Sequence, residues 1–204
     1  THLELDLFGA SGNESVSNSH GIRLRHAYGS LGGLLAGQTW SNFMVVSALP
    51  DTLDFGGPAG QTFVRQAQLR WTQPLSGGQW SVALENPETV VARPDGSTLR
   101  ADDDRAFDIT GNLGFKTAMG DYNLVGLARQ VRIDSAAPAA QDSKWGGGIG
   151  VFGVVPMFGK DSLSFGVNAG NAIGRYWGGL VVDGFLDGSG QLDLPDQVGG
   201  FVAY

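Results

Sequence analysis

Phe-Asp-Ile-Thr-Gly-Asn-Leu-Gly-Phe-Lys, residues 107–116, alternates apolar with hydrophilic positions along its whole length. Successive residues of a β-strand point to opposite faces of the sheet, so this stretch predicts a strand with one apolar and one hydrophilic face. The same period of two recurs in residues 62–72, 80–85 and 162–170. In residues 62–72, Arg65 interrupts the apolar face near one end, where its side chain could snorkel.

Six more segments predict strands, which brings the total to about ten, each near the 9–11 residues that a tilted transmembrane strand requires. They are residues 2–8, 21–28, 33–40, 122–133, 145–157 and 198–204. Short turns are expected at residues 29–32, 75–78, 119–121 and 159–161, and long polar loops at 9–20, 87–105, 134–144 and 173–197. Alternation of short and long connections is typical of outer-membrane barrels, whose external loops are longer than their periplasmic turns.

The composition excludes several other classes of protein. The net charge of -7 and the pI near 4.7 argue against nucleic-acid binding, and the absence of cysteine excludes disulfides and thiolate metal sites. The longest apolar run, residues 149–158, contains two glycines and Pro156 and is too short for a transmembrane helix. Only a β-barrel could still carry this chain across a membrane, because every backbone polar group must be paired there.

Two all-β architectures fit the alternation. In a soluble β-sandwich, such as a carbohydrate-binding module, the apolar faces would form a core and the polar faces would meet water. In a transmembrane barrel, aromatic residues near strand ends would form girdles at the two membrane interfaces. This chain places five aromatic residues in such positions: Trp71, Trp80, Phe115, Tyr122 and Trp145. We therefore predict an all-β, antiparallel up-and-down transmembrane β-barrel formed by residues 1–204 as one domain, with the sandwich as the alternative.

The barrel hypothesis fixes the orientation of each alternating strand. Apolar side chains should face lipid, and their hydrophilic neighbours should line the interior. The first set is Phe107, Ile109, Leu113, Phe115, Leu163, Phe165 and Val167. The second set is Asp108, Thr110, Asn112, Ser162 and Asn168. A soluble fold would bury the first set instead.

One long connection, residues 41–60, is not uniformly polar. Its apolar residues need a surface to pack on, so we expect it to fold inward against the barrel wall: Phe43, Met44, Leu49, Leu53 and Phe55. In and around it, Gly-Gln-Thr-Trp-Ser (37–41), Leu-Pro-Asp-Thr-Leu-Asp-Phe-Gly-Gly-Pro (49–58) and Phe-Val-Arg-Gln (63–66) resemble the DcaP-like outer-membrane porins. Three further segments resemble the family less specifically: residues 23–29, 83–89 and 174–176.

The resemblance implies a homotrimeric barrel of about sixteen strands in the bacterial outer membrane, a size that leaves an aqueous channel. It implies that residues 41–60 are the constriction loop and that this chain is a partial barrel lacking strands at both ends. Family members are associated with uptake of dicarboxylic and aromatic acids. The implied function is passive diffusion of small polar or anionic solutes, such as dicarboxylates, without a cofactor.

Seven residues are candidates for the pore lining and its selectivity: Arg23, Arg25, Gln66, Gln68, Arg70, Asp51 and Asp54. Arg23 and Arg25 should face the lumen, because they alternate with Ile22, Leu24, His26 and Tyr28. Arg70 should reach the same space beside the two glutamines. Arginines opposite acidic residues of the inward loop would create a binding site for a carboxylate. Equally, the arginines could pair with Asp51 and Asp54 and merely hold the loop.

Apparent enzyme motifs lack their structural context. Gly148, Gly150 and Gly153 spell G-x-G-x-x-G, but the alternation continues around them as a strand and opens no helix. The histidines at positions 2, 20 and 26 show no metal-binding spacing, and the acidic run 102–104 lacks the ligand pattern of a calcium loop. A barrel enzyme would need a nucleophile and a base on adjacent strand ends, and the sequence offers no such pair. We therefore predict a channel without catalytic residues, metal or cofactor.

Overall fold

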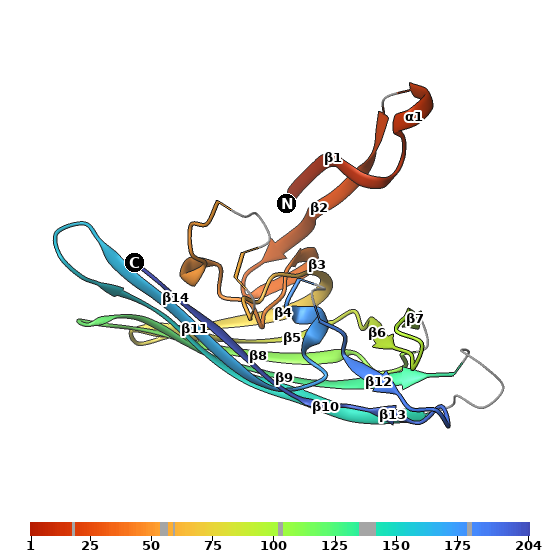
Figure 1. Cartoon of the computed structure of the whole chain (residues 1–204). Helices are drawn as coiled ribbons and strands as arrows, with labels where there is room; N and C mark the ends of the chain where they lie inside the picture. The colour runs from red at the N-terminus through yellow and green to blue at the C-terminus, as the bar shows by residue number, and fades with distance from the viewer. Residues whose placement is uncertain (18, 54–56, 59, 102–103, 135–141, 179–180) are drawn as a thin grey trace.

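The computed structural model describes residues 1–17, 19–53, 57–58, 60–101, 104–134, 142–178 and 181–204. Its main feature is a 10-stranded antiparallel sheet in which the strands lie in the order of the chain (Figure 1). The strands are β1 (His2–Asn13), β2 (Ser19–Leu31), β3 (Leu34–Trp40), β4 (Arg65–Leu75), β5 (Gly78–Glu85), β8 (Asp108–Thr117), β9 (Gly120–Ile133), β10 (Asp142–Pro156), β11 (Ser162–Asn171) and β14 (Asp196–Ala203). Each corresponds to a segment in which the sequence predicts a strand.

The alternating stretch 107–116 becomes β8, in the middle of the sheet. Leu113 lies opposite Trp80 of β5 on one side and Leu124 of β9 on the other. Opposed residues of antiparallel strands share a face, so the apolar positions of neighbouring strands join into one continuous surface. Short turns join β2 to β3, β4 to β5, β8 to β9 and β10 to β11, as the sequence predicts.

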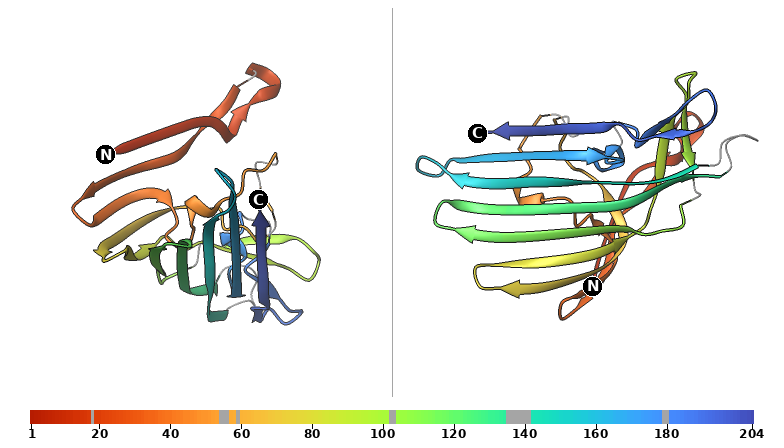
Figure 2. Two further views of the ribbon diagram at one scale, coloured as in Figure 1. Left: turned by 90° about the vertical axis from the view of Figure 1, so that its left-hand side faces the viewer. Right: turned by 90° about the horizontal axis from the view of Figure 1, so that it is seen from below.

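The sheet curves into an open arc, with β1 and β14 at its two edges (Figure 2). On the convex face, Ile109 and Phe115 are 45% and 44% exposed, whereas Asp108 and Thr110 on the concave face are completely buried. Three more residues of the apolar set are exposed as Ile109 is: Phe107, Leu113 and Val167. Leu163 and Phe165 are half-buried. Ser162, at the end of its strand, is exposed. A soluble protein would show the reverse arrangement. The sandwich alternative is therefore wrong, and the predicted antiparallel transmembrane sheet of an incomplete barrel is confirmed.

Two of the long connections are partly ordered as a second sheet. β6 (Thr89–Ala92) and β7 (Thr98–Ala101) precede β8, while β12 (Gly184–Leu186) and β13 (Leu192–Asp193) precede β14. The four strands form one sheet in which β12 runs parallel to β6. Val91, Leu186 and Leu192 pack with Val131 and Ile133 at the end of β9. The expectation of polar loops at 87–105 and 173–197 is thus wrong in part, because scattered apolar residues from both connections meet only in the fold.

The expected loop at residues 9–20 is also mostly strand. Gly9 pairs with Gly21 and Asn13 with Ser19, so the β1–β2 hairpin continues as far as the short helix α1 (Glu14–Ser17). Figure 1 shows this hairpin standing away from the rest of the sheet. The polar composition of the segment misleads, because a strand that extends beyond the lipid meets water on both faces and no longer needs to alternate. In the expected loop 134–144, residues 135–141 lie outside the described residues.

A β-bulge corrects the predicted phase of β2. Glu4 lies opposite His26, whereas the next residue, Leu5, lies opposite Leu24, so Arg25 is an extra residue of β2. A bulge shifts the alternation by one position. His26, expected on the exposed face together with Leu24, is only 6% exposed, whereas Leu24 is 40% exposed.

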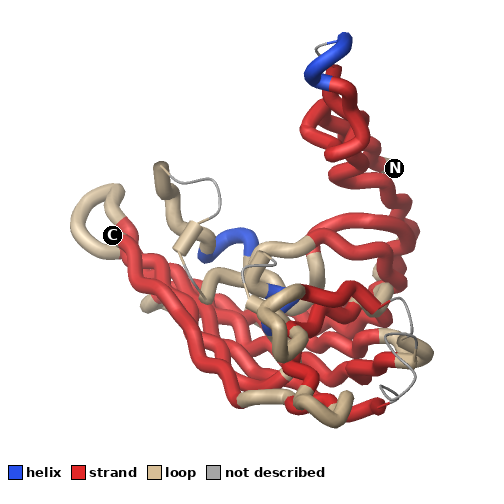
Figure 3. The backbone as a smooth tube through the Cα atoms, turned by 45° about the vertical axis from the view of Figure 1, so that its right-hand side comes forward, coloured by secondary structure: helices blue, strands red, loops and turns tan. Residues whose placement is uncertain are grey.

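Helical structure is sparse, as Figure 3 shows. Besides α1, the described residues contain the single turns η1 (Val46–Ala48) and η2 (Gly174–Tyr176). No helix in this part of the chain is long and apolar enough to cross a membrane.

Candidate functional site

Two connecting segments lie on the concave side of the sheet (Figure 3). The first inward segment, residues 41–64, joins β3 to β4 and is described except for 54–56 and 59. The second inward segment, residues 172–183, joins β11 to β12 and is described except for 179–180. Phe43 of the first segment packs edge-on against Tyr176 of the second, with ring centroids 5.4 Å apart. The backbone N–H of Phe63 donates to the Tyr176 carbonyl over 2.8 Å, so the two segments support each other.

The first inward segment crosses the concave side to the far edge of the sheet. The Gly60 carbonyl accepts a hydrogen bond of 2.8 Å from Asn168 of β11. Gly60 has a φ of +85°, and a Cβ there would lie 2.4 Å from the Gly200 nitrogen of β14. Only glycine permits both this backbone conformation and this close approach.

Glu85 of β5 holds the start of the first inward segment. Its carboxylate is fully buried and accepts hydrogen bonds from the Ser41 hydroxyl at 3.1 Å and the Asn42 backbone N–H at 2.7 Å. The Gln66 amide and the Thr110 hydroxyl each donate to it over 2.9 Å. Within the described residues no basic group lies at ion-pair distance from Glu85. Neutral donors alone therefore solvate this wall carboxylate and tie the loop entrance to the barrel.

A buried cation holds the second inward segment. Arg129 of β9 is completely buried, and its guanidinium forms ion pairs with Asp183 at 2.9 Å and with Asp108 at 3.3 Å. It also donates to the Ala172 carbonyl over 3.2 Å, so it contacts both ends of the segment. The Tyr176 hydroxyl donates to Asp108 over 2.9 Å and completes the network. The wall thus fixes the second segment mainly through opposite charges.

The arginines predicted to face the loop carboxylates have other partners. Arg23 Nε donates to Asp6 of β1 over 3.0 Å, and Arg25 Nη1 contacts the same carboxylate at 3.2 Å. Arg25 also pairs with Glu4. Asp51 is exposed and forms no ion pair within the described part of the chain, and Asp54 lies outside the described residues.

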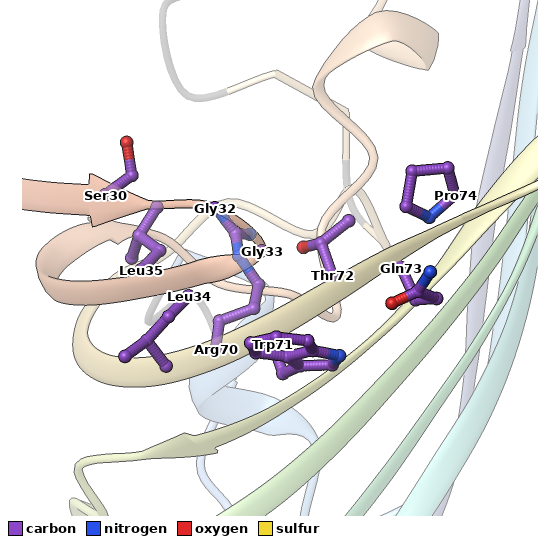
Figure 4. Close-up of a pocket in the computed structure, with 10 residues that line it drawn as sticks. All are labelled: Ser30, Gly32, Gly33, Leu34, Leu35, Arg70, Trp71, Thr72, Gln73 and Pro74. Carbon is purple, nitrogen blue, oxygen red and sulfur yellow. The ribbon is translucent and has the colours of Figure 1, made fainter.

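The remaining predicted residues lie on β4. Gln66 and Gln68 are buried, and Gln68 donates to the Trp40 carbonyl over 2.9 Å. Figure 4 shows Arg70 on the opposite side of β4 from Trp71, beside a cavity of about 450 Å³. Arg70 is half-buried and has no ion pair or hydrogen bond in the described structure. The glutamines therefore belong to the base of the loop. Arg70 has no ion-pair partner among the described residues, and Glu85 interacts with its charge only at longer range.

The sequence of the first 167 residues, more than four fifths of the chain, matches the family model of the DcaP outer membrane protein. The chain belongs to this family. The resemblance and the outer-membrane location predicted from the sequence are thereby confirmed. None of the curated proteins compared with this DcaP-family chain is a match.

A solved structure supports the fold of this DcaP-family chain. The crystal structure of the outer membrane channel DcaP of Acinetobacter baumannii matches it with a TM-score of 0.78 at 22% sequence identity. The match covers 97% of this chain and 55% of that channel, so the chain spans little more than half of its length. At this identity the likeness establishes the fold of the DcaP-family sheet and nothing finer.

The pattern-based search missed the residues that hold the inward segments of this DcaP-family chain. The alternation identifies Asp108 and Glu85 only as hydrophilic positions of their strands, and Glu85 also lies in a segment that resembles the family. Arg129 carries the clearest overlooked signal, because it stands in β9 between inward-facing Leu127 and Val131. A lone charge on a buried apolar face of a strand requires a partner. The partner, Asp183, lies 54 residues away in the chain, beyond the reach of local patterns.

Proposed function

We propose that this DcaP-family chain forms part of the wall and the constriction of a water-filled channel through the outer membrane. The channel passes small polar or anionic solutes, such as dicarboxylates, by passive diffusion and performs no catalysis. One observation carries the proposal: two anchored segments fill part of the polar concave side of a sheet whose convex side is apolar. Segments folded into a polar lumen set the width and the charge of its narrowest point. The solved relative is described as an outer membrane channel.

The preference for anions rests on the arginines of the concave side. Arg70 has no described partner, and Arg23 and Arg25 share the carboxylates of Asp6 and Glu4. A guanidinium presents a planar fork of donors that matches a carboxylate. A dicarboxylate passing this wall would therefore find one free guanidinium and two that are partly compensated.

Single-channel recording on the complete protein tests the proposal. Arg25→Ala combined with Arg70→Ala should shift the reversal potential in a salt gradient toward that of a non-selective pore and weaken block by succinate. Arg105→Ala is the matched control, because Arg105 pairs with Asp134 at 3.1 Å outside the sheet and is 72% exposed. Wild-type selectivity and block in the double variant would show that these arginines are structural. A complete absence of conductance in the wild-type protein would reject the channel itself.

We also propose that residues 1–204 form a single partial barrel domain, with residues 41–60 as the constriction loop, and that the complete protein is a homotrimer. The family resemblance and the continuous sheet order support this arrangement. Native mass spectrometry of the complete protein in detergent should show a mass three times that of the protomer, and a monomer peak alone would contradict it.

A further inference from the structure

Four arginines line one cleft beside the outer end of the sheet. Arg23 comes from β2, Arg65 from β4, Arg100 from β7 and Arg175 from η2. Among the described residues that line this cleft, whose volume is about 500 Å³, Glu88 is the one carboxylate. We call it the arginine cleft. Its basic residues come from elements far apart in the sequence, and no local pattern brings them together.

The cleft exists because β2 leaves its neighbour. β2 pairs with β3 only over Ala27–Leu31, whereas it pairs with β1 as far as Ser19. The outer half of the hairpin therefore swings away from β3, as Figure 1 shows. Arg23 and Leu24 line the opening, and the Gln38 side chain of β3 reaches across to donate to the Leu24 carbonyl over 2.9 Å.

Aromatic rings hold the Arg65 guanidinium in place, and one of its nitrogens has no hydrogen-bond partner among the described residues. The sequence suggested that its side chain reaches toward the membrane interface, but the guanidinium stacks on Trp40, with Cζ 3.7 Å from the ring centroid. Phe63 lies at 5.6 Å on the same guanidinium. Arg65 Nη2 is buried and has no hydrogen-bond partner. Arg65 Nε donates to His26 Nε2 over 3.4 Å. Buried donors are nearly always paired, so two aromatic rings hold a guanidinium whose Nη2 donors are still unused.

The other arginines of the cleft are also incompletely paired within the described residues. Arg100 is exposed and forms no ion pair within the described residues. Arg175 Nη1 donates to the Asn86 carbonyl over 3.1 Å, and within the described part of the chain this is the one hydrogen bond of its five side-chain N–H groups. Arg23 pairs with Asp6 of β1, and Glu88 is exposed at the rim. Among the described residues that line the cleft, positive charge therefore exceeds negative charge.

We propose that the arginine cleft is a binding site for a phosphate group. A carboxylate offers two oxygens in one plane and is satisfied by one or two guanidinium forks. A phosphate carries nearly two negative charges and at least three acceptor oxygens, which suits donors arriving from several elements. Because the arginines come from β2, β4, β7 and η2, a bound phosphate ties the outer hairpin, the small sheet and the second inward segment together.

Isothermal titration of pyrophosphate into the complete protein in a neutral detergent tests the site. Arg65→Gln with Arg100→Gln should weaken binding at least about tenfold, because charged hydrogen bonds are lost. Arg65→Lys keeps the charge without the fork and should give an intermediate affinity. Arg100→Gln alone lies on an exposed strand position and retains the fold, so a weaker affinity in this variant cannot reflect unfolding. Arg105→Gln, outside the cleft, is the control and should bind as the wild type does.

A phosphate group can come from a lipid headgroup or from a soluble compound, and nanodiscs distinguish the two sources. Pyrophosphate binding that is present in neutral detergent but disappears in nanodiscs of zwitterionic phospholipid, whose headgroups also carry a phosphate, assigns the site to a headgroup. Titration that persists in both assigns it to a soluble phosphate. Equal pyrophosphate affinities for the wild type and for Arg65→Gln with Arg100→Gln overturn the proposal. This readout needs no conductance, so it stands or falls separately from the channel function.

Discussion

The two inward segments are held by the same wall in opposite ways. Glu85, an anion, grips the first segment through neutral donors, among them a backbone N–H and the Ser41 hydroxyl. Arg129, a cation, grips the second through Asp108 and Asp183, which are buried as completely as it is. Neutral donors lose little hydrogen-bond free energy when their acceptor is replaced, because water that enters the site can accept from them instead. Buried charges depend on each other, since an unpaired charge in a dry site is far more costly. The second segment should therefore be the more sensitive of the two.

The largest expected effect follows from removing the cation. Arg129→Met leaves Asp108 and Asp183 buried without a counter-charge and should destabilise the complete protein by about 3–5 kcal/mol. Urea unfolding in detergent, followed by tryptophan fluorescence, measures this loss. Trp177 lies in the second inward segment and reports on it directly.

A compensated variant sharpens this result. Arg129→Met together with Asp108→Asn and Asp183→Asn removes the charges on both sides, and replacing a complete buried ion network by neutral groups is often nearly neutral. The triple variant should therefore regain part of the lost stability. If the single variant is as stable as the wild type, Arg129 does not hold the second segment.

A smaller effect is expected for the first segment. Glu85→Ala removes the common acceptor of four donors and should cost about 1–3 kcal/mol, while Glu85→Gln retains one acceptor oxygen and should cost less. The loosened loop entrance should raise the open-channel current noise of the alanine variant above that of the glutamine variant. Identical noise in the wild type and both variants would mean that the remaining contacts of the first segment suffice to fix it.

The same contrast explains what the sequence could and could not predict. The alternation in 107–116 and its three repeats predicts four strands of the main sheet, because lipid on one side and a polar interior on the other impose a local pattern of period two. Six further segments predict the remaining strands. The pattern failed where that cause is absent. It missed the hairpin extension around Gly9 and Asn13, which meets water on both faces, and it mistook the phase of His26 beyond the bulge.

The candidate site was harder to predict, because its partners are distant in sequence. Arg23 and Arg25 lie on one strand, and their carboxylate partners come from β1 rather than from the inward loop. The periodicity of a strand does not specify which charged residue of a neighbouring strand will pair with its own. The anchor Asp183 lies in a segment that looks like an ordinary polar loop, and its role appears only when the fold brings it to Arg129.

The smallest structural effect, and the finest test of the charge pattern, is expected at Asp6. This residue is half-buried and pairs with Arg23 and Arg25, which remain partly exposed, unlike the fully buried pairs of Arg129. Solvent-accessible ion pairs contribute little to stability, so Asp6→Asn should unfold at nearly the same urea concentration as the wild type. The asparagine removes one negative charge and leaves both guanidinium groups with less compensation. Anion preference in single-channel recordings should therefore rise, and it should rise less in 1 M salt, where charges are screened within about 3 Å. Asp161→Asn is a suitable control, because Asp161 accepts a hydrogen bond from Tyr204 at a turn remote from these arginines. If Asp6→Asn leaves the selectivity unchanged, Arg23 and Arg25 serve only to fasten β1 to β2, and Arg70 remains as the arginine of the predicted set that can select anions.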